Sequence, residues 1–232
     1  MRYILLSIVL ICCGCSHHSL DNSVGAEYIG ARYENDPLGE EIPPDNDPLI
    51  RFDAFDCTTF VETVLADGDV EKLNQIRYRD GKPNFINRNH FIETDWLENN
   101  HKIVANVSNQ YAATTIRNIT IDKKSWLKTV HNIDAEFAPQ NTNLEYIPYQ
   151  NIRDIKISKP VIVLFISDTG KIRDKIGTDL AVRHMGFLLS NGILRHASRK
   201  EKRVIDVDFQ EYVSKIKRNK NNLGIVLLEI KK

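Results

Sequence analysis

The stretch that decides the fold covers residues 182 to 198 and reads Val182-Arg183-His184-Met185-Gly186-Phe187-Leu188-Leu189-Ser190-Asn191-Gly192-Ile193-Leu194-Arg195-His196-Ala197-Ser198. Two β-rich runs flank a Ser-Asn-Gly turn, which predicts a hairpin. A two-residue turn at Asn191-Gly192 would place the two His on opposite faces. A three-residue loop with Gly192 in the left-handed conformation pairs Gly186 with His196 and places both imidazoles on one face. We expect the second register.

Strands also dominate the sequence around this hairpin. Runs typical of strands cover residues 160–167, 184–189, 193–197, 203–209 and 224–230, and short turns between them favour antiparallel pairing. Helical spacing appears earlier in the chain, over 57–66, 70–76 and 123–131, with a further strand at 114–121. Helices first and strands afterwards indicate an α+β fold, in which helices carrying Cys57 pack on an antiparallel sheet carrying the His pair.

Cys57 stands at the expected start of the first long helix, in the context Phe55-Asp56-Cys57-Thr58-Thr59. Either Asp56 caps this helix, or Thr59 and Glu62 form a capping box. Both alternatives place the thiol in the first turn, where the helix dipole and free N–H groups favour the thiolate and could stabilise an oxyanion. The competing interpretation is a buried Cys that acts as a small hydrophobic residue.

Nucleophilic chemistry at Cys57 requires a base, and the hairpin supplies one. We expect His184 to accept the thiol proton and His196 to fix the tautomer of His184. A metal site formed by the same three residues is an alternative, but the short ligand spacings typical of zinc sites are missing. We therefore expect no metal and no organic cofactor.

The other three cysteines, Cys12, Cys13 and Cys15, follow an apolar run too short to span a bilayer, which takes about 20 residues. Residues 1–15 resemble the signal peptide of a bacterial lipoprotein, which is cleaved before a lipid-modified Cys, here Cys15. A plainly cleaved signal peptide and an uncleaved anchor are the alternatives. We expect an exported, periplasmic or cell-envelope protein on a membrane anchor, with residues 16–24 as a tether and 25–232 as a single catalytic domain.

The composition excludes several classes of protein. The 232 residues include 31 Lys or Arg and 31 Asp or Glu, and the formal net charge is zero. Nucleic-acid-binding proteins usually carry a basic excess, so we expect no nucleic-acid partner. One cysteine outside the first fifteen residues leaves no disulfide framework. We expect a monomer.

The residues around Cys57 and the His pair resemble those of the NlpC-like cell-wall hydrolases, bacterial relatives of papain. Phe55-Asp56-Cys57, His184-Met185-Gly186-Phe187 and Leu194-Arg195-His196-Ala197-Ser198 are similar to the motifs that carry the Cys, the base His and the third polar residue in that superfamily. The resemblance implies a papain-like fold and a Cys-His-His hydrolase.

A narrower resemblance adds residues 55–62, 76–83, 89–91, 94–96 and 181–184. These match a branch of N-acetylmuramoyl-L-alanine amidases that was once a domain of unknown function. The resemblance implies peptidoglycan fragments (muropeptides) as substrates, and hydrolysis of the amide between MurNAc and L-Ala, on anhydro-MurNAc forms. Hydrolysis of the γ-D-glutamyl–diamino acid bond by the same residues is an alternative, and so is a noncatalytic wall-binding lipoprotein.

Several polar and aromatic residues are candidates for substrate binding. Asn89, His90, Asp95 and Trp96 combine directed hydrogen-bonding groups with an aromatic plane, which suits a glycopeptide. The alternative is a loop whose polar groups satisfy its own backbone. Two further candidates are Tyr33, which relatives place near the cleft, and Arg183, beside the base.

Overall fold

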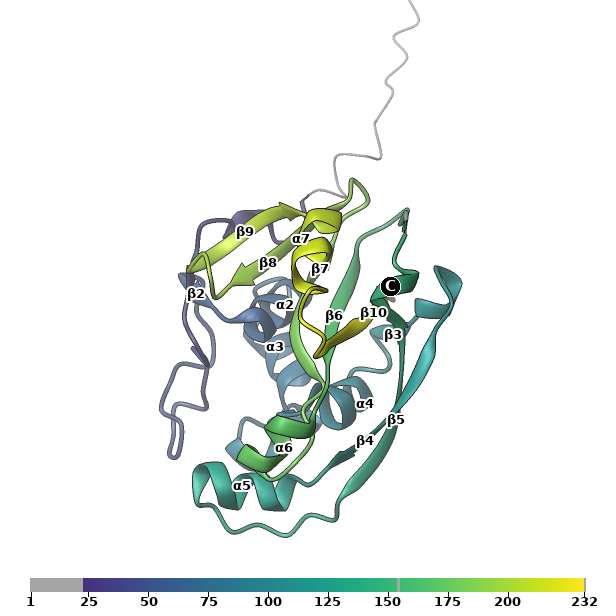
Figure 1. Cartoon of the computed structure of the whole chain (residues 1–232). Helices are drawn as coiled ribbons and strands as arrows, with labels where there is room; N and C mark the ends of the chain where they lie inside the picture. The colour runs from purple at the N-terminus through teal and green to yellow at the C-terminus, as the bar shows by residue number, and fades with distance from the viewer. Residues whose placement is uncertain (1–22, 154, 232) are drawn as a thin grey trace, which may run out of the picture.

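The computed structural model describes residues 23–153 and 155–231 and contains one large mixed sheet with helices on both faces (Figure 1). The strands are β1 Arg32–Tyr33, β2 Ala54–Phe55, β3 Val104–Asn106, β4 Thr115–Ile121, β5 Gln140–Pro148, β6 Val161–Ser167, β7 Val182–Leu188, β8 Ile193–Ser198, β9 Arg203–Asp208 and β10 Asn222–Ile230. The α-helices are α2 Cys57–Leu65, α3 Val70–Arg77, α4 Leu97–Asn99, α5 Lys123–His131, α6 Gly170–Ile176 and α7 Phe209–Ile216. The expected mixture of helices and strands is confirmed.

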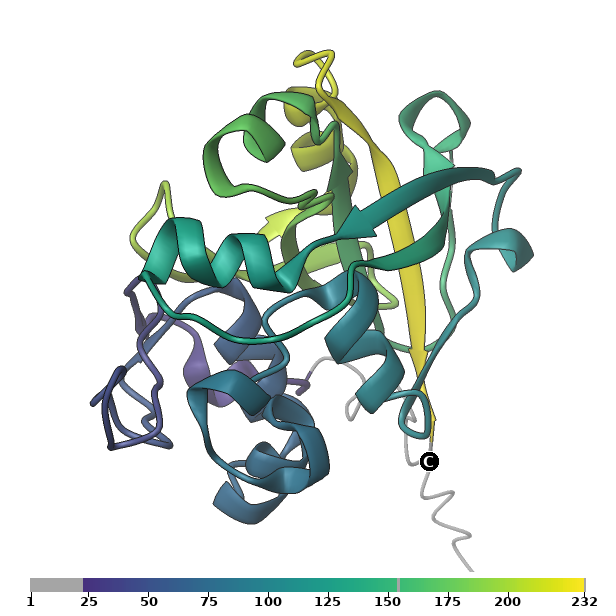
Figure 2. The same cartoon turned by 90° about the horizontal axis from the view of Figure 1, so that it is seen from below.

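The sheet runs in the order β2-β1-β9-β8-β7-β6-β10-β5-β4, with β3 paired to β10. Neighbours from β9 to β4 are antiparallel, as the short connections predict, whereas β1 and β2 pair in parallel. The purple and blue N-terminal segments gather in the lower left of Figure 2, and the green-to-yellow C-terminal helices occupy its upper part.

Apolar side chains fill both faces of the central strands. Along β6, Ile162, Leu164 and Ile166 belong to the cluster shared with α2 and α3, whereas Val163 and Phe165 belong to the cluster shared with α7. Successive residues of a strand point to opposite faces, so a strand covered on both sides is apolar throughout. The central strands are therefore covered on both faces, by α2 on one and by α7 on the other.

The sequence prediction was incomplete in the second half of the chain. Strand β5 and helices α6 and α7 were not predicted, and the predicted strand 203–209 runs one residue into α7. No helix in the described residues is long and apolar enough to cross a membrane. The predicted signal peptide, the lipidation residue Cys15 and most of the tether 16–24 lie outside the described residues.

Candidate active site

Helix α2 begins at the candidate nucleophile because Asp56 caps it. The Asp56 carboxylate accepts a hydrogen bond from the Thr59 backbone N–H at 2.8 Å, and the Thr59 hydroxyl accepts one from the Asp56 N–H at 3.0 Å. This is a capping box, and it makes Cys57 the first helical residue. Of the two predicted caps, the one at Asp56 is confirmed and the Thr59–Glu62 box is wrong, because Glu62 is occupied elsewhere.

Glu62 lies buried on the inner side of α2 and anchors that helix. Its carboxylate accepts hydrogen bonds from the Arg77 guanidinium at 2.9 Å and from the Trp96 indole N–H at 3.0 Å. Burial raises the Glu62 pKa, and Arg77 opposes that shift. A buried charge of this kind is tolerated only when it is paired and hydrogen-bonded. The triad therefore fixes α2, and Cys57 with it, against the segment that carries Trp96.

The hairpin adopts the bulged register. Phe187 pairs with Arg195 and Leu188 with Leu194, and Leu189 donates its N–H to the Ile193 carbonyl at 2.8 Å. Gly192 has a φ of +81°, the left-handed conformation that this turn requires. The predicted three-residue loop is confirmed.

Gly186 gives the two imidazoles room to meet. A Cβ built at Gly186 would lie 2.8 Å from the Cβ of His196 and 2.7 Å from the Arg195 carbonyl oxygen, closer than side chains tolerate. His184 Nε2 and His196 Nδ1 are 2.7 Å apart, within hydrogen-bonding distance. The predicted same-face arrangement of the His pair is therefore confirmed.

His196 is buried, His184 is half-buried, and both imidazoles are held neutral. Burial, followed by the proximity of His196, lowers the pKa of His184 to about 3, and burial lowers that of His196 to about 4. One nitrogen of this pair must carry the bridging hydrogen. When Nε2 of His184 donates it, Nδ1 of His184 is left without a proton, which is the form of a general base.

The Cys57 thiol lies against the strand that carries His184. Burial, followed by the neighbouring Asp56 carboxylate, raises the pKa of the thiol to about 12, and the Met185 backbone N–H and the Thr58 side chain oppose that shift. Only Phe187 and Leu188 of β7 form ladder pairs with β8, so Met185 lies beyond the paired part of these strands. We infer that the thiol reaches the sheet next to Met185.

Two tyrosines lie beside this centre. Cys57 contributes to raising the pKa of Tyr33 and that of Tyr212, both to about 12, with burial as the main cause. The Tyr212 ring lies 5.2 Å from the His196 ring and 6.3 Å from the His184 ring. Sequence reasoning missed Tyr212. Its signal was Asp208 followed by apolar residues at helical spacing, which marks a capped amphipathic helix.

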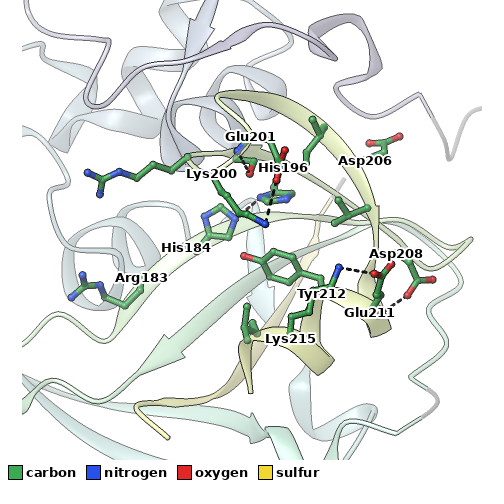
Figure 3. A pocket seen from close by; sticks show the side chains of 15 residues that line it. Arg183, His184, His196, Lys200, Glu201, Asp206, Asp208, Glu211, Tyr212 and Lys215 are labelled. Atoms are coloured by element: carbon green, nitrogen blue, oxygen red, sulfur yellow. Dashed lines mark hydrogen bonds and ion pairs between the residues drawn. The ribbon is translucent and has the colours of Figure 1, made fainter. Parts of the chain in front are cut away.

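A cavity of about 710 Å³ opens on the α7 side of the His pair. His184, His196 and Tyr212 line it, together with charged side chains from the β8–β9 turn and α7 (Figure 3). A smaller cavity of about 180 Å³ flanks the start of α2 and is lined by Asp56, Thr58 and aromatic rings. Charged side chains, among them Asp36, Arg77 and Arg88 in the smaller cavity, therefore line both cavities.

A family model described as AmiA-like, N-acetylmuramoyl-L-alanine amidase-like, matches residues 23–224. The chain belongs to this family. A crystal structure of a DUF1460 protein from Legionella pneumophila superposes on this AmiA-like protein with a TM-score of 0.81 and 25% identity, over 91% of this chain and 88% of that one. A crystal structure of an N-acetylmuramoyl-L-alanine amidase from Bacteroides uniformis gives a TM-score of 0.68 and 23% identity, over 91% and 99%. The second likeness supports the fold alone. No curated protein matches.

Two of the predicted substrate-binding residues lie near the candidate Cys-His-His site of this AmiA-like protein. Tyr33 is half-buried within electrostatic reach of Cys57, and Arg183 lines the charged cavity beside His184. Their positions are compatible with substrate contact.

In the segment Asn89 to Trp96, Asp95 and Trp96 serve the fold instead. Trp96 is fully buried and donates to Glu62, so the expectation that it offers a stacking face is wrong. Asn89 donates to the Ile76 carbonyl at 3.0 Å, and Asp95 forms a buried ion pair with Lys123 at 3.0 Å. His90 bonds the Phe85 carbonyl at 2.7 Å. Of these four, Asn89 and His90 still line the smaller cavity.

Glu93, in the same segment, positions the strand of the base and was not predicted. It is 4% exposed and sits in a π-helical turn, Ile92–Trp96. Its Oε1 accepts hydrogen bonds from the N–H groups of Ala181 and Val182 at 2.6 and 2.7 Å, directly before His184. Within residues 23–153 and 155–231, no group of three or more His, Cys, Asp or Glu is arranged to hold a metal.

Proposed function

We propose that this protein is a cysteine-dependent N-acetylmuramoyl-L-alanine amidase that acts on muropeptides, in particular anhydro-MurNAc forms. The observation that carries the proposal is a thiol at a capped helix start, packed against the strand of a hydrogen-bonded His pair, in a chain of the amidase-like family. We also propose that the fold is papain-like, because a helix-start Cys and a base on the sheet are what that architecture brings together.

The first step transfers the Cys57 thiol proton to Nδ1 of His184 while the sulfur attacks the lactyl carbonyl carbon. Burial holds both groups neutral in the free protein, since it raises the pKa of Cys57 and lowers that of His184. Neither charge is stable there alone, but thiolate and imidazolium stabilise each other when they form together. The site therefore favours proton transfer coupled to attack.

The start of α2 stabilises the negative oxygen that attack creates. The first helical hydrogen bond runs from the Phe60 N–H to the Asp56 carbonyl, and Asp56 also caps the Thr59 N–H. The N–H groups of Cys57 and Thr58 precede this ladder and are the donors available for an oxyanion.

Collapse of the tetrahedral intermediate breaks the C–N bond. The His184 imidazolium donates its proton to the departing L-Ala nitrogen, and the lactyl group remains on Cys57 as a thioester. Water then gives a proton to His184 and its oxygen to the acyl carbon, which releases a free lactyl carboxyl and restores the thiol. His196 keeps the ring of His184 oriented by the 2.7 Å contact.

Product masses test the proposal. Defined anhydro-muropeptides are incubated with wild type, with Cys57→Ala and with the control Cys57→Ser, and the products are separated by mass spectrometry. We expect free anhydro-disaccharide and intact stem peptide from the wild type, and neither from the two variants. A disaccharide dipeptide would instead assign a γ-D-glutamyl endopeptidase. Full turnover by Cys57→Ala would refute the nucleophile, and EDTA inhibition would favour a metal site.

We further propose that the protein is exported and anchored to the membrane by lipid at Cys15. The proposal rests on the lipobox-like sequence at residues 10–15. Detergent-phase partitioning of full-length protein and of Cys15→Ala tests it. We expect only the first to enter the detergent phase, and equal partitioning would refute lipidation.

A further inference from the structure

An irregularity in β7 places Arg183 at the edge of the cavity that the candidate base also lines. His184 pairs with Phe165 and Val182 pairs with Ile166, so β7 has one residue more than β6 at this point, and that residue is Arg183. Without the bulge, neighbours in a strand point to opposite faces. Bulges are common beside active sites because they redirect a side chain. Here Arg183 and His184 both line the 710 Å³ cavity.

The acidic groups of this cavity already have partners. Asp206 is bound by Arg195 at 2.7 Å, Glu211 by Lys215 and Glu201 by Lys200. The remaining carboxylate, Asp208, accepts the Glu211 N–H at 2.7 Å as the cap of α7.

Two cationic side chains of the cavity, Arg183 and Arg199, have no ion-pair partner among the described residues. Within residues 23–153 and 155–231, neither Arg183 nor Arg199 forms an ion pair or a side-chain hydrogen bond. Arg199 lies within electrostatic reach of Tyr33, which itself neighbours Cys57. Figure 3 shows Arg183 on the opposite side of His184 from Asp208 and Glu211. Both arginines are exposed and line the same cavity as the His pair, so the unpaired positive charge lies at its edge, on the side away from those two acids.

The proposed chemistry fixes which part of the substrate meets this charge. His184 protonates the departing nitrogen, so the peptide lies on the side of the cavity that His184 and His196 line. The acyl side, which carries the sugar, then lies toward the smaller cavity at Asp56 and Thr58. Beyond L-Ala the stem continues through the γ-carboxyl of D-Glu, which leaves the α-carboxylate of that residue free.

We propose that Arg183 and Arg199 form a carboxylate-binding subsite for the departing peptide and select stems whose D-Glu carries a free α-carboxylate. The inference rests on the proposed function and extends it to substrate selection. A guanidinium binds a carboxylate in a bidentate, charge-assisted geometry, and an amide in the same position loses that interaction.

Kinetics with matched substrates test this subsite. Anhydro-MurNAc-L-Ala-γ-D-Glu is compared with the same compound carrying D-isoglutamine, for wild type, Arg183→Gln, Arg199→Gln and the distant exposed control Arg218→Gln. We expect wild type and the control to prefer the carboxylate by about tenfold or more in kcat/KM. We expect each cavity variant to lose most of that preference through a higher KM, with turnover of the amide substrate nearly unchanged. Equal losses on both substrates, or no preference in the wild type, would overturn the subsite.

A binding measurement separates failure of the subsite from failure of the proposed function. The dipeptide L-Ala-γ-D-Glu is titrated calorimetrically into Cys57→Ala and into Cys57→Ala combined with Arg183→Gln. We expect binding by the first protein to be about tenfold tighter or more, whether or not either substrate is hydrolysed. Equal affinity would overturn the subsite, whereas turnover by the wild type tests the amidase proposal independently.

Discussion

Replacing Gly186 with Ala tests how the hairpin holds the His pair. The new Cβ would lie 2.7 Å from the Arg195 carbonyl oxygen and 2.8 Å from the His196 Cβ, both below the 3.0 Å that real Cβ atoms respect. Neither neighbour is the flexible end of a side chain. The Arg195 side chain is also held by Asp206 through two hydrogen bonds of 2.7 Å. Strand β8 must therefore move as a unit, and His196 must move with it.

The expected cost follows from overpacking. Inserting a methyl group into a packed site costs about 1–3 kcal/mol, and 1 kcal/mol shifts Tm by about 2–4 °C for a domain of 150–250 residues. We expect Gly186→Ala to lower Tm by roughly 2–12 °C. The 2.7 Å contact between His184 and His196 would lengthen, so the base loses its fixed orientation. Because general base catalysis contributes about 10²–10⁴-fold, we expect kcat/KM to fall by about 100-fold or more.

The assay is hydrolysis of an anhydro-muropeptide at 20 °C, with thermal unfolding measured on the same samples. Gly177→Ala is the matched control, since Gly177 has a φ of +81° at the end of α6, where a Cβ would meet atoms at 3.3 Å. A left-handed residue with a Cβ costs about 1–2 kcal/mol, so this variant should lose similar stability and keep its activity. A folded Gly186→Ala protein with more than half of wild-type activity would refute the reasoning.

Three further predictions concern the framework and its response to pH. Glu93→Ala leaves two buried N–H groups at the start of β7 unpaired, so we expect a lower kcat and faster hydrogen exchange at those amides. Glu93→Gln keeps an acceptor oxygen and should behave like wild type. Unchanged hydrogen exchange in Glu93→Ala would contradict the role of Glu93. Arg77→Ala leaves the Glu62 carboxylate buried without its ion-pair partner, and urea titration should show that the free energy of unfolding falls by about 3–5 kcal/mol. A fall of less than about 1 kcal/mol would contradict the burial argument. Because the pKa of His184 is lowered to about 3, the unfolded chain binds a proton below pH 6.5 that the folded chain does not. The free energy of unfolding should therefore fall by about 1.4 kcal/mol per pH unit for this group as pH drops from 6.5 toward 3. Urea titrations at several pH values should show that the unfolding free energy of His184→Gln depends less steeply on pH than that of the exposed control His101→Gln.

The features predicted from sequence depend on local rules. A left-handed Gly in a three-residue turn sets the hairpin register, and an Asp before Cys57 sets the helix start. Each involves residues close together in the chain, so a single sequence contains enough information. The pairing of His184 with His196 followed from the register alone.

The sequence predictions were wrong where the role of a residue depends on contacts with residues far away in the chain. Trp96 lies in a polar and aromatic stretch typical of a sugar-binding site. Its indole N–H, however, donates a hydrogen bond to the buried carboxylate of Glu62 in α2. The sequence around Trp96 does not indicate that its indole is the hydrogen-bond donor to Glu62. Helix α7 and its Tyr212 are a different case, because the cap and helical spacing were present but directly followed a strand. The β-rich run of β9 obscured the change from strand periodicity to helical periodicity at Phe209.

The central claim, that Cys57 becomes acylated by the lactyl group of MurNAc, is tested most directly by trapping the intermediate. Wild-type protein and Cys57→Ala are mixed with an anhydro-muropeptide, quenched in acid within the first turnover, digested and examined by peptide mass mapping. We expect an anhydro-muramoyl thioester on the peptide that contains Cys57, and no adduct on the variant. An adduct that also includes L-Ala and D-Glu would show cleavage at the γ-glutamyl bond, and turnover with no adduct on Cys57 would contradict the proposed mechanism.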